Sequence, residues 1–175
     1  VQKELAHTLT LIRDKGVAGF YEGDTADDIV AEMKQGNGII TKEDLKNYDT
    51  KWRTPLVGNY KNYKVISMPP SSSGGVALLQ MLKMGEAYPV EKWVCHSGAA
   101  VHLMVEAERR GCTERTEHLG DSDLYNVPID SLVKEEYLKK RMSDFSMEKT
   151  TPSSSIYAGN CKMRKETFET THTSI

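Results

Sequence analysis

The sequence predicts an α+β chain that is mostly helical and carries one short β-hairpin. Apolar residues recur at helical spacing in several stretches of residues 1–143. Only residues 55–68 change to strand-forming residues, around a central Tyr-Lys-Asn-Tyr. The 175 residues suit about one domain, with 38% hydrophobic and 27% charged residues. We therefore expect a helix-rich portion at 1–143, followed by a polar stretch that begins at 144.

The first two helices follow from apolar residues spaced three or four apart. Residues 1–17 form the first, and Gly16 and Gly19 end it. The second covers 25–34, with Thr25 as its expected N-cap because Asp28 follows three residues later. Glycine and asparagine tolerate positive φ, so the run 35–38 should end it. Its apolar stripe consists of Ala26, Ile29, Val30 and Met33.

Further along, a second capping pattern at Thr41–Asp44 opens a short helix. Residues 55–68 form a hairpin or two short strands, and Pro69-Pro70 cannot continue a sheet ladder. Three more helices are expected, and their ranges are about 74–82, 94–115 and 130–142. Residues 144–169 are polar and lack periodicity, so we expect an exposed connector that is a candidate for disorder.

Composition excludes several classes of function. The net charge is −2 and no basic stripe occurs, which argues against nucleic acid as a partner. No apolar run approaches ~18 residues, so no membrane span is expected. The chain begins directly in a helical pattern, so we expect no signal peptide within it. The three cysteines match no metal pattern and suit buried or loop thiols, with one disulfide plus a free thiol as the alternative; they are Cys95, Cys112 and Cys161.

Two local motifs suggest binding, and each has a simpler structural explanation. The run Ser71–Gly75 precedes a helix, where free N–H groups favour an anion. Serine capping and close packing at the glycines explain it as well. Asp121 and Asp123 resemble a Ca²⁺ loop, but two carboxylates are too few, so we expect a turn and no metal. No cofactor is expected.

The stretch 169–175, Glu-Thr-Thr-His-Thr-Ser-Ile, resembles the processing site of the γ-glutamyltranspeptidases, whose small subunit begins Thr-Thr-His-x-Ser. Upstream stretches agree with the family in order. They are Gly-Phe-Tyr-Glu-Gly at 19–23, Gly-Ile-Ile-Thr-Lys-Glu-Asp-Leu-Lys-Asn-Tyr at 38–48, Ser-Met-Pro-Pro-Ser-Ser-Ser-Gly-Gly-Val-Ala-Leu-Leu-Gln-Met at 67–81 and His-Leu-Gly-Asp-Ser-Asp at 118–123. The resemblance covers nearly the whole chain. It implies a fragment of the αββα sandwich of the N-terminal-nucleophile (Ntn) hydrolases.

The resemblance implies roles for four residues. Cleavage between Glu169 and Thr170 would make residues 170–175 the start of the small subunit and Thr170, its first residue, the catalytic nucleophile. Its free α-amine, with a pKa near ~8, would then serve as its base. Thr171 and His172 would line or orient the site, with a purely structural role as the alternative.

One stretch departs from the family pattern. Cys112, Thr113 and Glu114 stand where the family tends to have an aromatic residue, alanine and aspartate. An acid–base stretch such as Arg109–Arg115 is expected to be a helix surface or a structural ion pair. The departure bears on local packing more than on the reaction class.

By resemblance, the precursor cleaves itself and then transfers or hydrolyses the γ-glutamyl group of glutathione and related amides. Its partners would be the γ-glutamyl substrate, an amine or water acceptor, and the small subunit. The location would be periplasmic or extracellular. The alternatives are an acylase of the same fold, acting on a cephalosporin-type amide or poly-γ-glutamate, and a non-catalytic helical module. The 175-residue chain alone should be inactive, and the apolar faces of helices 1–17, 25–34 and 94–115 should lack cover.

Overall fold

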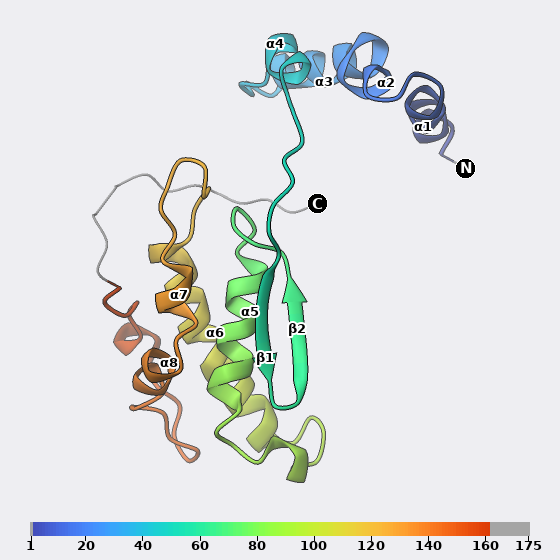
Figure 1. The fold of residues 1–175 in the computed structure, drawn as a ribbon. Helices are drawn as coiled ribbons and strands as arrows, with labels where there is room; N and C mark the ends of the chain where they lie inside the picture. The colour runs from blue at the N-terminus through green and yellow to red at the C-terminus, as the bar shows by residue number, and fades with distance from the viewer. Residues whose placement is uncertain (1, 162–175) are drawn as a thin grey trace. The chain divides into compact units, whose positions relative to one another are not determined.

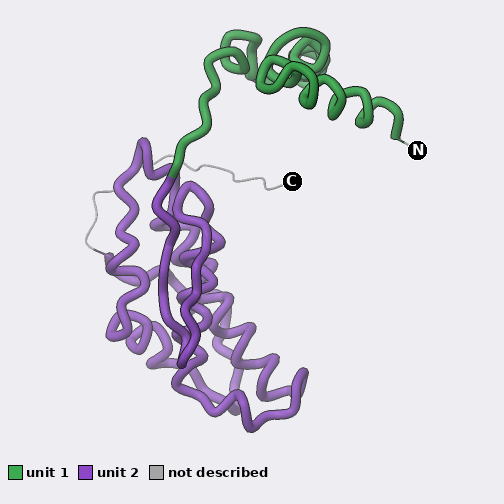
Figure 2. The backbone as a smooth tube through the Cα atoms, turned by 45° about the vertical axis from the view of Figure 1, so that its right-hand side comes forward, with its two compact units in different colours: residues 1–52 green, residues 53–175 purple. Residues whose placement is uncertain are grey.

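The computed structural model describes residues 2–161, which separate into two compact units divided between Trp52 and Arg53 (Figure 2). The first unit contains α1 (Lys3–Lys15), α2 (Ala18–Tyr21), α3 (Gly23–Gln35) and α4 (Lys42–Lys46). The second begins with the hairpin β1 (Leu56–Tyr60) and β2 (Tyr63–Ser67). It continues with α5 (Gly74–Gly85), α6 (Gly98–His118), α7 (Ile129–Leu132) and α8 (Glu135–Arg141). Single 3₁₀ turns occur at Val90–Lys92 and Ser153–Ser155.

The first unit agrees with most of its sequence predictions. Gly16, with φ of 59°, ends α1, and Thr41 and Asp44 form the expected capping box of α4. The predicted N-cap of α3 is wrong, because the helix begins two residues before Thr25. The Thr25 hydroxyl instead donates a hydrogen bond to the carbonyl of Gly19 at 3.3 Å. That bond ties the start of α3 to α2.

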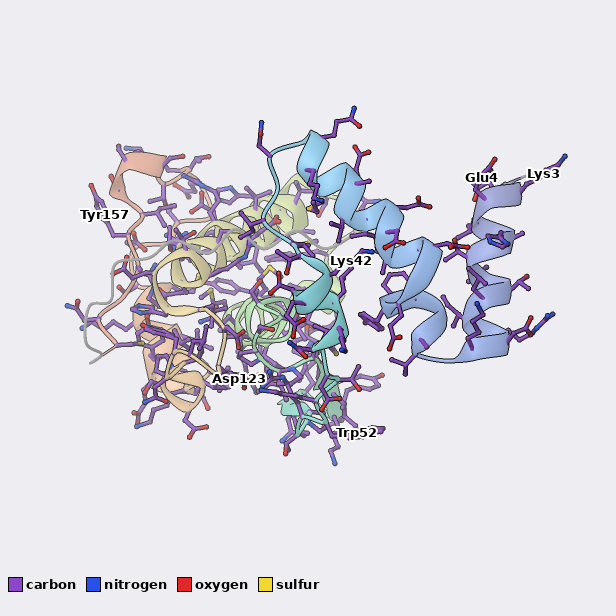
Figure 3. All side chains as sticks on the ribbon, turned by 90° about the horizontal axis from the view of Figure 1, so that it is seen from above. Lys3, Glu4, Lys42, Trp52, Asp123 and Tyr157 are labelled. Atoms are coloured by element: carbon purple, nitrogen blue, oxygen red, sulfur yellow. The ribbon has the colours of Figure 1, made fainter. Side chains whose placement is uncertain are left out.

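The apolar faces of this unit are covered to different extents. Ala26 and Val30 of α3 are buried, so that stripe is better covered than its sequence suggested. On α1, in contrast, Leu5 and Leu9 are at least half exposed. Trp52, labelled in Figure 3, is fully exposed at the end of the unit. The expected lack of cover is therefore confirmed for α1 and wrong for most of α3.

In the second unit the hairpin lies against α5 (Figure 1). Its register pairs Val57 with Ile66 and Tyr60 with Tyr63, so the predicted hairpin and its Tyr-Lys-Asn-Tyr turn are confirmed. The main core lies among α5, α6 and α8. Its buried members are Met84, Leu103, Ala107, Leu138 and Met142.

Two helix boundaries in this unit differ from the sequence prediction. The helix expected at 94–115 begins at Gly98, because the Ser97 hydroxyl caps it by accepting a bond from the amide of Ala100 at 3.3 Å. The single helix expected at 130–142 is two helices, α7 and α8. The carbonyl of Leu132 accepts a bond from the Gln80 side chain at 3.0 Å, which holds the end of α7 against α5.

The buried face of α6 is unusual because most of it is polar. Its members recur at helical spacing and are Leu103, Glu106, Ala107, Arg110, Gly111, Glu114 and His118. The four charged or titratable members follow one another at intervals of four residues, which places them on the same side of the helix. On the opposite side Val101, Met104 and Val105 stay exposed, so the expected lack of cover is confirmed for that face only.

The connector is the main correction to the sequence analysis. Its described part, 144–161, has mostly exposed side chains, but it follows a fixed path along α6. Arg110, which is 1% exposed, uses all five of its N–H groups. They go to the carbonyls of Glu106 and Arg141, the carboxylates of Glu106 and Asp144, and the hydroxyl of Thr151.

Glu106 completes this attachment. Its carboxylate, which is fully buried, accepts bonds from Arg109, Arg110 and the backbone amide of Thr151. Burial raises the pKa of Glu106, but the bonds from Arg110 and Thr151 outweigh it and leave the pKa below its ordinary value. Ile156, buried at 8% exposure, adds an apolar contact further along the same segment.

We predict that Gly111→Ala stabilises the protein by about 0.5–1 kcal/mol, because alanine is the better helix former. An added Cβ at Gly111 would lie 3.8 Å from Met81 Cγ and 3.9 Å from Gln80 Oε1, which is ordinary contact. Thermal unfolding measures the change. Gly75→Ala is the control and should destabilise, because its Cβ would overlap the carbonyl oxygen of Met68. A loss of stability in Gly111→Ala would contradict the packing described for α5 and α6.

We also predict that acid destabilises the protein partly through Glu106. A carboxyl group with a lowered folded pKa contributes stability above its unfolded pKa of about 4.3, and loses it as the pH falls through the folded value. Melting temperature should therefore fall between about pH 5 and pH 3. The fall should be smaller in Glu106→Gln. In the control Glu108→Gln, an exposed position on the same helix, it should match the wild type. Equal falls in the two variants would refute the assignment.

Candidate functional site

The last described residues before the expected processing site contact a polar cluster that is centred on Glu114. Glu114 is fully buried on α6. Its Oε2 accepts a bond from the Tyr137 hydroxyl at 2.5 Å, and its Oε1 accepts one from the amide of Gly159 at 2.9 Å. Arg141 Nε lies 2.5 Å from Oε1 as an ion pair, although its N–H is not aligned as a hydrogen bond. The structural ion pair expected for this stretch is therefore present, and it is buried.

Gly159 is attached to α6 at both of its backbone polar groups. Its amide donates to Glu114, and its carbonyl accepts a bond from His118 Nε2 at 2.8 Å. Because a carbonyl can only accept, this bond places the proton of His118 on Nε2. Arg141 adds a 2.5 Å bond to the carbonyl of Tyr157, whose side chain is exposed and labelled in Figure 3. The chain from 157 to 159 is thus held by side chains of α6 and α8.

The cluster holds two further groups in their neutral forms. Burial, followed by the hydrogen bond to Glu114, raises the pKa of Tyr137. Burial also raises the pKa of the Cys161 thiol, against the lowering effect of Tyr137. At neutral pH the phenol therefore stays a donor to Glu114.

Glu114, His118 and Cys161 each place one possible metal-ligand atom within 4.8 Å of the others. The set includes the nitrogen, sulfur and oxygen donors that Zn²⁺ uses. However, both carboxylate oxygens of Glu114 already accept bonds, and His118 Nε2 donates to Gly159. The Arg141 cation lies directly beside the carboxylate. The arrangement therefore fits a hydrogen-bonded attachment better than a metal centre.

The run Ser71–Gly75 serves packing. The Ser73 hydroxyl accepts a bond from Arg115 Nε at 3.0 Å and makes no cap bond, whereas Ser72 accepts one from the amide of Gly74 at 3.4 Å. Gly75 lets α5 approach the carbonyl of Met68 more closely than a Cβ would allow. These contacts support the structural explanation for the run rather than an anion cradle.

The loop at 121–123 is a turn held by an ion pair. Asp121 Oδ1 accepts a bond from the amide of Asp123 at 2.9 Å, as expected for an aspartate turn. Arg53 donates to both carboxylate oxygens of Asp123, at 2.9 and 2.8 Å. Ser122 donates to the carbonyl of Pro70, which fixes the loop beside the start of α5.

The three cysteines carry free thiols. Cys95 and Cys161 lie outside helices and strands, as expected for loop thiols, whereas Cys112 lies on α6, against the expectation of a buried or loop position. Cys95 and Cys112 are exposed and Cys161 is partly buried. Glu169, Thr170, Thr171 and His172 lie outside the described residues. The described chain ends at Cys161, nine positions before Thr170, directly after the attachment at Gly159.

Sequence reasoning did not single out Glu106, Arg110 or His118, and it took Glu114 as a departure in local packing. A signal was present, because alternating charges at steps of four along 106, 110, 114 and 118 place all four on one helix face. A search for apolar stripes overlooks such a face. The partly buried Tyr137 and Arg141 of α8 gave no comparable signal.

Comparison with known proteins identifies the family. The family model described as gamma-glutamyltranspeptidase matches residues 1–175. The chain is 41% identical over its whole length to a glutathione hydrolase proenzyme of Pseudomonas sp. (strain A14), and 39% identical to one of Escherichia coli (strain K12). The structure of Helicobacter pylori γ-glutamyltranspeptidase matches 95% of this chain and 48% of its own, with 41% identity and a TM-score of 0.80. The expected α+β fragment of an Ntn-hydrolase fold is thereby confirmed.

Less similar relatives carry other names. The chain is 30% identical to an acylase ACY 1 proenzyme of Pseudomonas sp. (strain V22). It spans about 30% of the length of these relatives. In the described residues no helix is both long enough and apolar enough to cross a bilayer. On the match along its full length, the chain belongs to the γ-glutamyltranspeptidase family.

Proposed function

We propose that this chain is the part of a glutathione hydrolase precursor that leads into its self-cleavage site, and that cleavage occurs between Glu169 and Thr170. The observation that carries the proposal is the Thr-Thr-His-Thr-Ser motif at the end of a chain that matches the family throughout. The similar relatives named above are proenzymes, which agrees with a cleavage step. The attachment of segment 144–161 to α6 supplies an ordered approach to the junction.

The proposed chemistry uses the Thr170 hydroxyl in two steps, first in self-cleavage and then in attack on the substrate. Before cleavage, Thr170 Oγ attacks the carbonyl carbon of Glu169, and the peptide bond shifts to an ester with release of the Thr170 nitrogen as an amine. Water then hydrolyses the ester and frees a chain that starts at Thr170. The new amine, with a pKa of about 8, takes the hydroxyl proton when Thr170 attacks a substrate amide.

The substrate we propose is the γ-glutamyl amide of glutathione and similar compounds. Attack by Thr170 forms a γ-glutamyl ester and releases the amine half of the substrate. Water or an acceptor amine resolves the ester, which implies ping-pong kinetics. Identity to the glutathione hydrolases exceeds identity to the acylase by about ten percentage points, which favours this substrate over a cephalosporin-type amide.

Two further parts of the proposal follow the family. The partner of this chain is the small subunit made from the same precursor, with Thr171 and His172 lining the joint site. The enzyme acts in the periplasm or outside the cell, which fractionation of the host for γ-glutamyl-amide hydrolysis would test.

We predict that the full-length precursor yields a smaller product whose N-terminal sequence begins Thr-Thr-His-Thr. Thr170→Ala should bring cleavage and turnover below detection, because both steps use its hydroxyl. Thr170→Ser should keep part of each. N-terminal sequencing and amine release from a γ-glutamyl amide measure the two steps.

Thr171→Ala is the matched control, because it removes a threonine hydroxyl from the next residue in the chain. It should cleave and turn over with a milder loss. A product that starts at Thr171, or a Thr171→Ala variant that is inactive beside a normal Thr170→Ala, would show that the nucleophile is the other threonine. Faster release from a cephalosporin amide than from a γ-glutamyl amide would favour the acylase function.

A further inference from the structure

We propose that Glu114 is a positioning residue for self-cleavage: together with His118 it fixes the backbone at Gly159, and so sets the point from which the chain runs to the Glu169–Thr170 junction. This inference rests on the proposed function, because it concerns the efficiency of the same cleavage. It assigns a role to a buried carboxylate on α6 that neither the nucleophile nor the substrate requires.

The geometry is a two-point attachment of one residue. The amide of Gly159 donates to Glu114 at 2.9 Å, and its carbonyl accepts from His118 at 2.8 Å. Glu114 and His118 lie one helical turn apart, so they hold the two sides of one peptide segment against one helix face. Two bonds to a single residue fix its orientation as well as its place.

The partners of Glu114 keep its carboxylate in one position. Tyr137 donates to one oxygen and Arg141 pairs with the other, and both come from α8. Arg141 also binds the carbonyl of Tyr157, two residues before Gly159. The attachment therefore joins α6, α8 and the approaching chain in a single hydrogen-bonded set.

Gly159 itself fits only without a side chain. A Cβ there would overlap the hydroxyl of Tyr137, which is held on Glu114. The backbone at Gly159 therefore packs so closely against Tyr137 that a single methyl group would not fit between them. A connector that lay free in solvent would not need such close packing.

Stability alone is a poor reason for this cluster. A buried carboxylate loses its hydration, and replacing a buried ion pair with well-packed apolar groups is often neutral or stabilising. What the ionic set provides and an apolar patch does not is direction, because its bonds are made to particular backbone atoms. In this protein those bonds hold backbone atoms of Tyr157 and Gly159, in the segment that precedes the junction.

Loss of Glu114 would take away the acceptor of the Gly159 amide, while His118 would still hold the Gly159 carbonyl and Arg141 the Tyr157 carbonyl. The segment would stay attached to α6 and α8, but the orientation of Gly159 would be less well defined. Cleavage should therefore slow but still occur before Thr170.

The test follows the time course of cleavage in the full-length precursor. We expect slower cleavage in Glu114→Ala, which removes the acceptor of the Gly159 amide. His118→Phe removes the donor to the Gly159 carbonyl, together with the 3.5 Å contact between His118 and Glu114, and should also slow cleavage. Glu114→Asp keeps the charge on a shorter side chain and should fall between Glu114→Ala and the wild type.

Two controls separate positioning from stability. Glu117→Ala makes the same charge change at an exposed position of α6 and should cleave at the wild-type rate. Val76→Ala deletes buried volume in α5 and lowers the melting temperature without touching the cluster. It should also cleave at the wild-type rate below its melting temperature. If Glu114→Ala does not fold, His118→Phe carries the test.

Wild-type cleavage rates in both Glu114→Ala and His118→Phe would overturn the inference and leave the proposed function intact. An equal slowdown in Val76→Ala would also overturn it, since instability would then explain the effect. A wild-type precursor that is never cleaved before Thr170 would overturn both proposals together.

Discussion

The constraint on which the second unit depends is that every buried charge on α6 must be paired. A buried carboxylate or guanidinium without partners costs several kcal/mol, and α6 buries Glu106, Arg110 and Glu114 on one face. The helix supplies only part of the compensation, through the bonds that Arg109 and Arg110 make to Glu106. The remaining bonds must come from other elements. They come from α8 and from the chain that follows it.

The path of that chain is a consequence of this requirement. Arg110 takes the carbonyl of Arg141 and the side chains of Asp144 and Thr151, while Glu106 takes the Thr151 amide. Glu114 takes the amide of Gly159. A segment with little regular secondary structure and few apolar residues thereby acquires a defined course along the helix. The α6 face acts as a template for the residues that lead toward the expected junction.

The sequence predicted the parts of the fold whose signals are local. The hairpin turn at Lys61, the capping box at Thr41 and the glycine stop at Gly16 depend on a few adjacent residues, and all three are present. The family assignment depended on motifs that are likewise short and ordered. The boundary at Leu132 failed because a distant contact decided it, the bond from Gln80 to its carbonyl. The start of α6 failed although its cap, Ser97, is local.

The connector could not be predicted because its order comes from elsewhere in the chain. Judged by its own composition, 144–161 is polar and aperiodic, which is typical of unfolded chain. Its partners on α6 are charged residues 34 to 45 positions earlier, on a helix face that hydrophobic periodicity does not reveal. The candidate nucleophile shows the opposite case. Thr170 was inferred from a motif alone, and its surroundings depend on residues outside the described part of the chain.

The most direct test of this account is amide hydrogen exchange along residues 144–161. The amides of Thr151 and Gly159 donate to the buried carboxylates of Glu106 and Glu114, so they should exchange many times more slowly than an unprotected amide. The amides of Lys149 and Asn160, at exposed neighbouring positions, should exchange fast and serve as internal controls. Exchange at the unprotected rate for Thr151 and Gly159 would contradict the claim that the α6 carboxylates hold this segment.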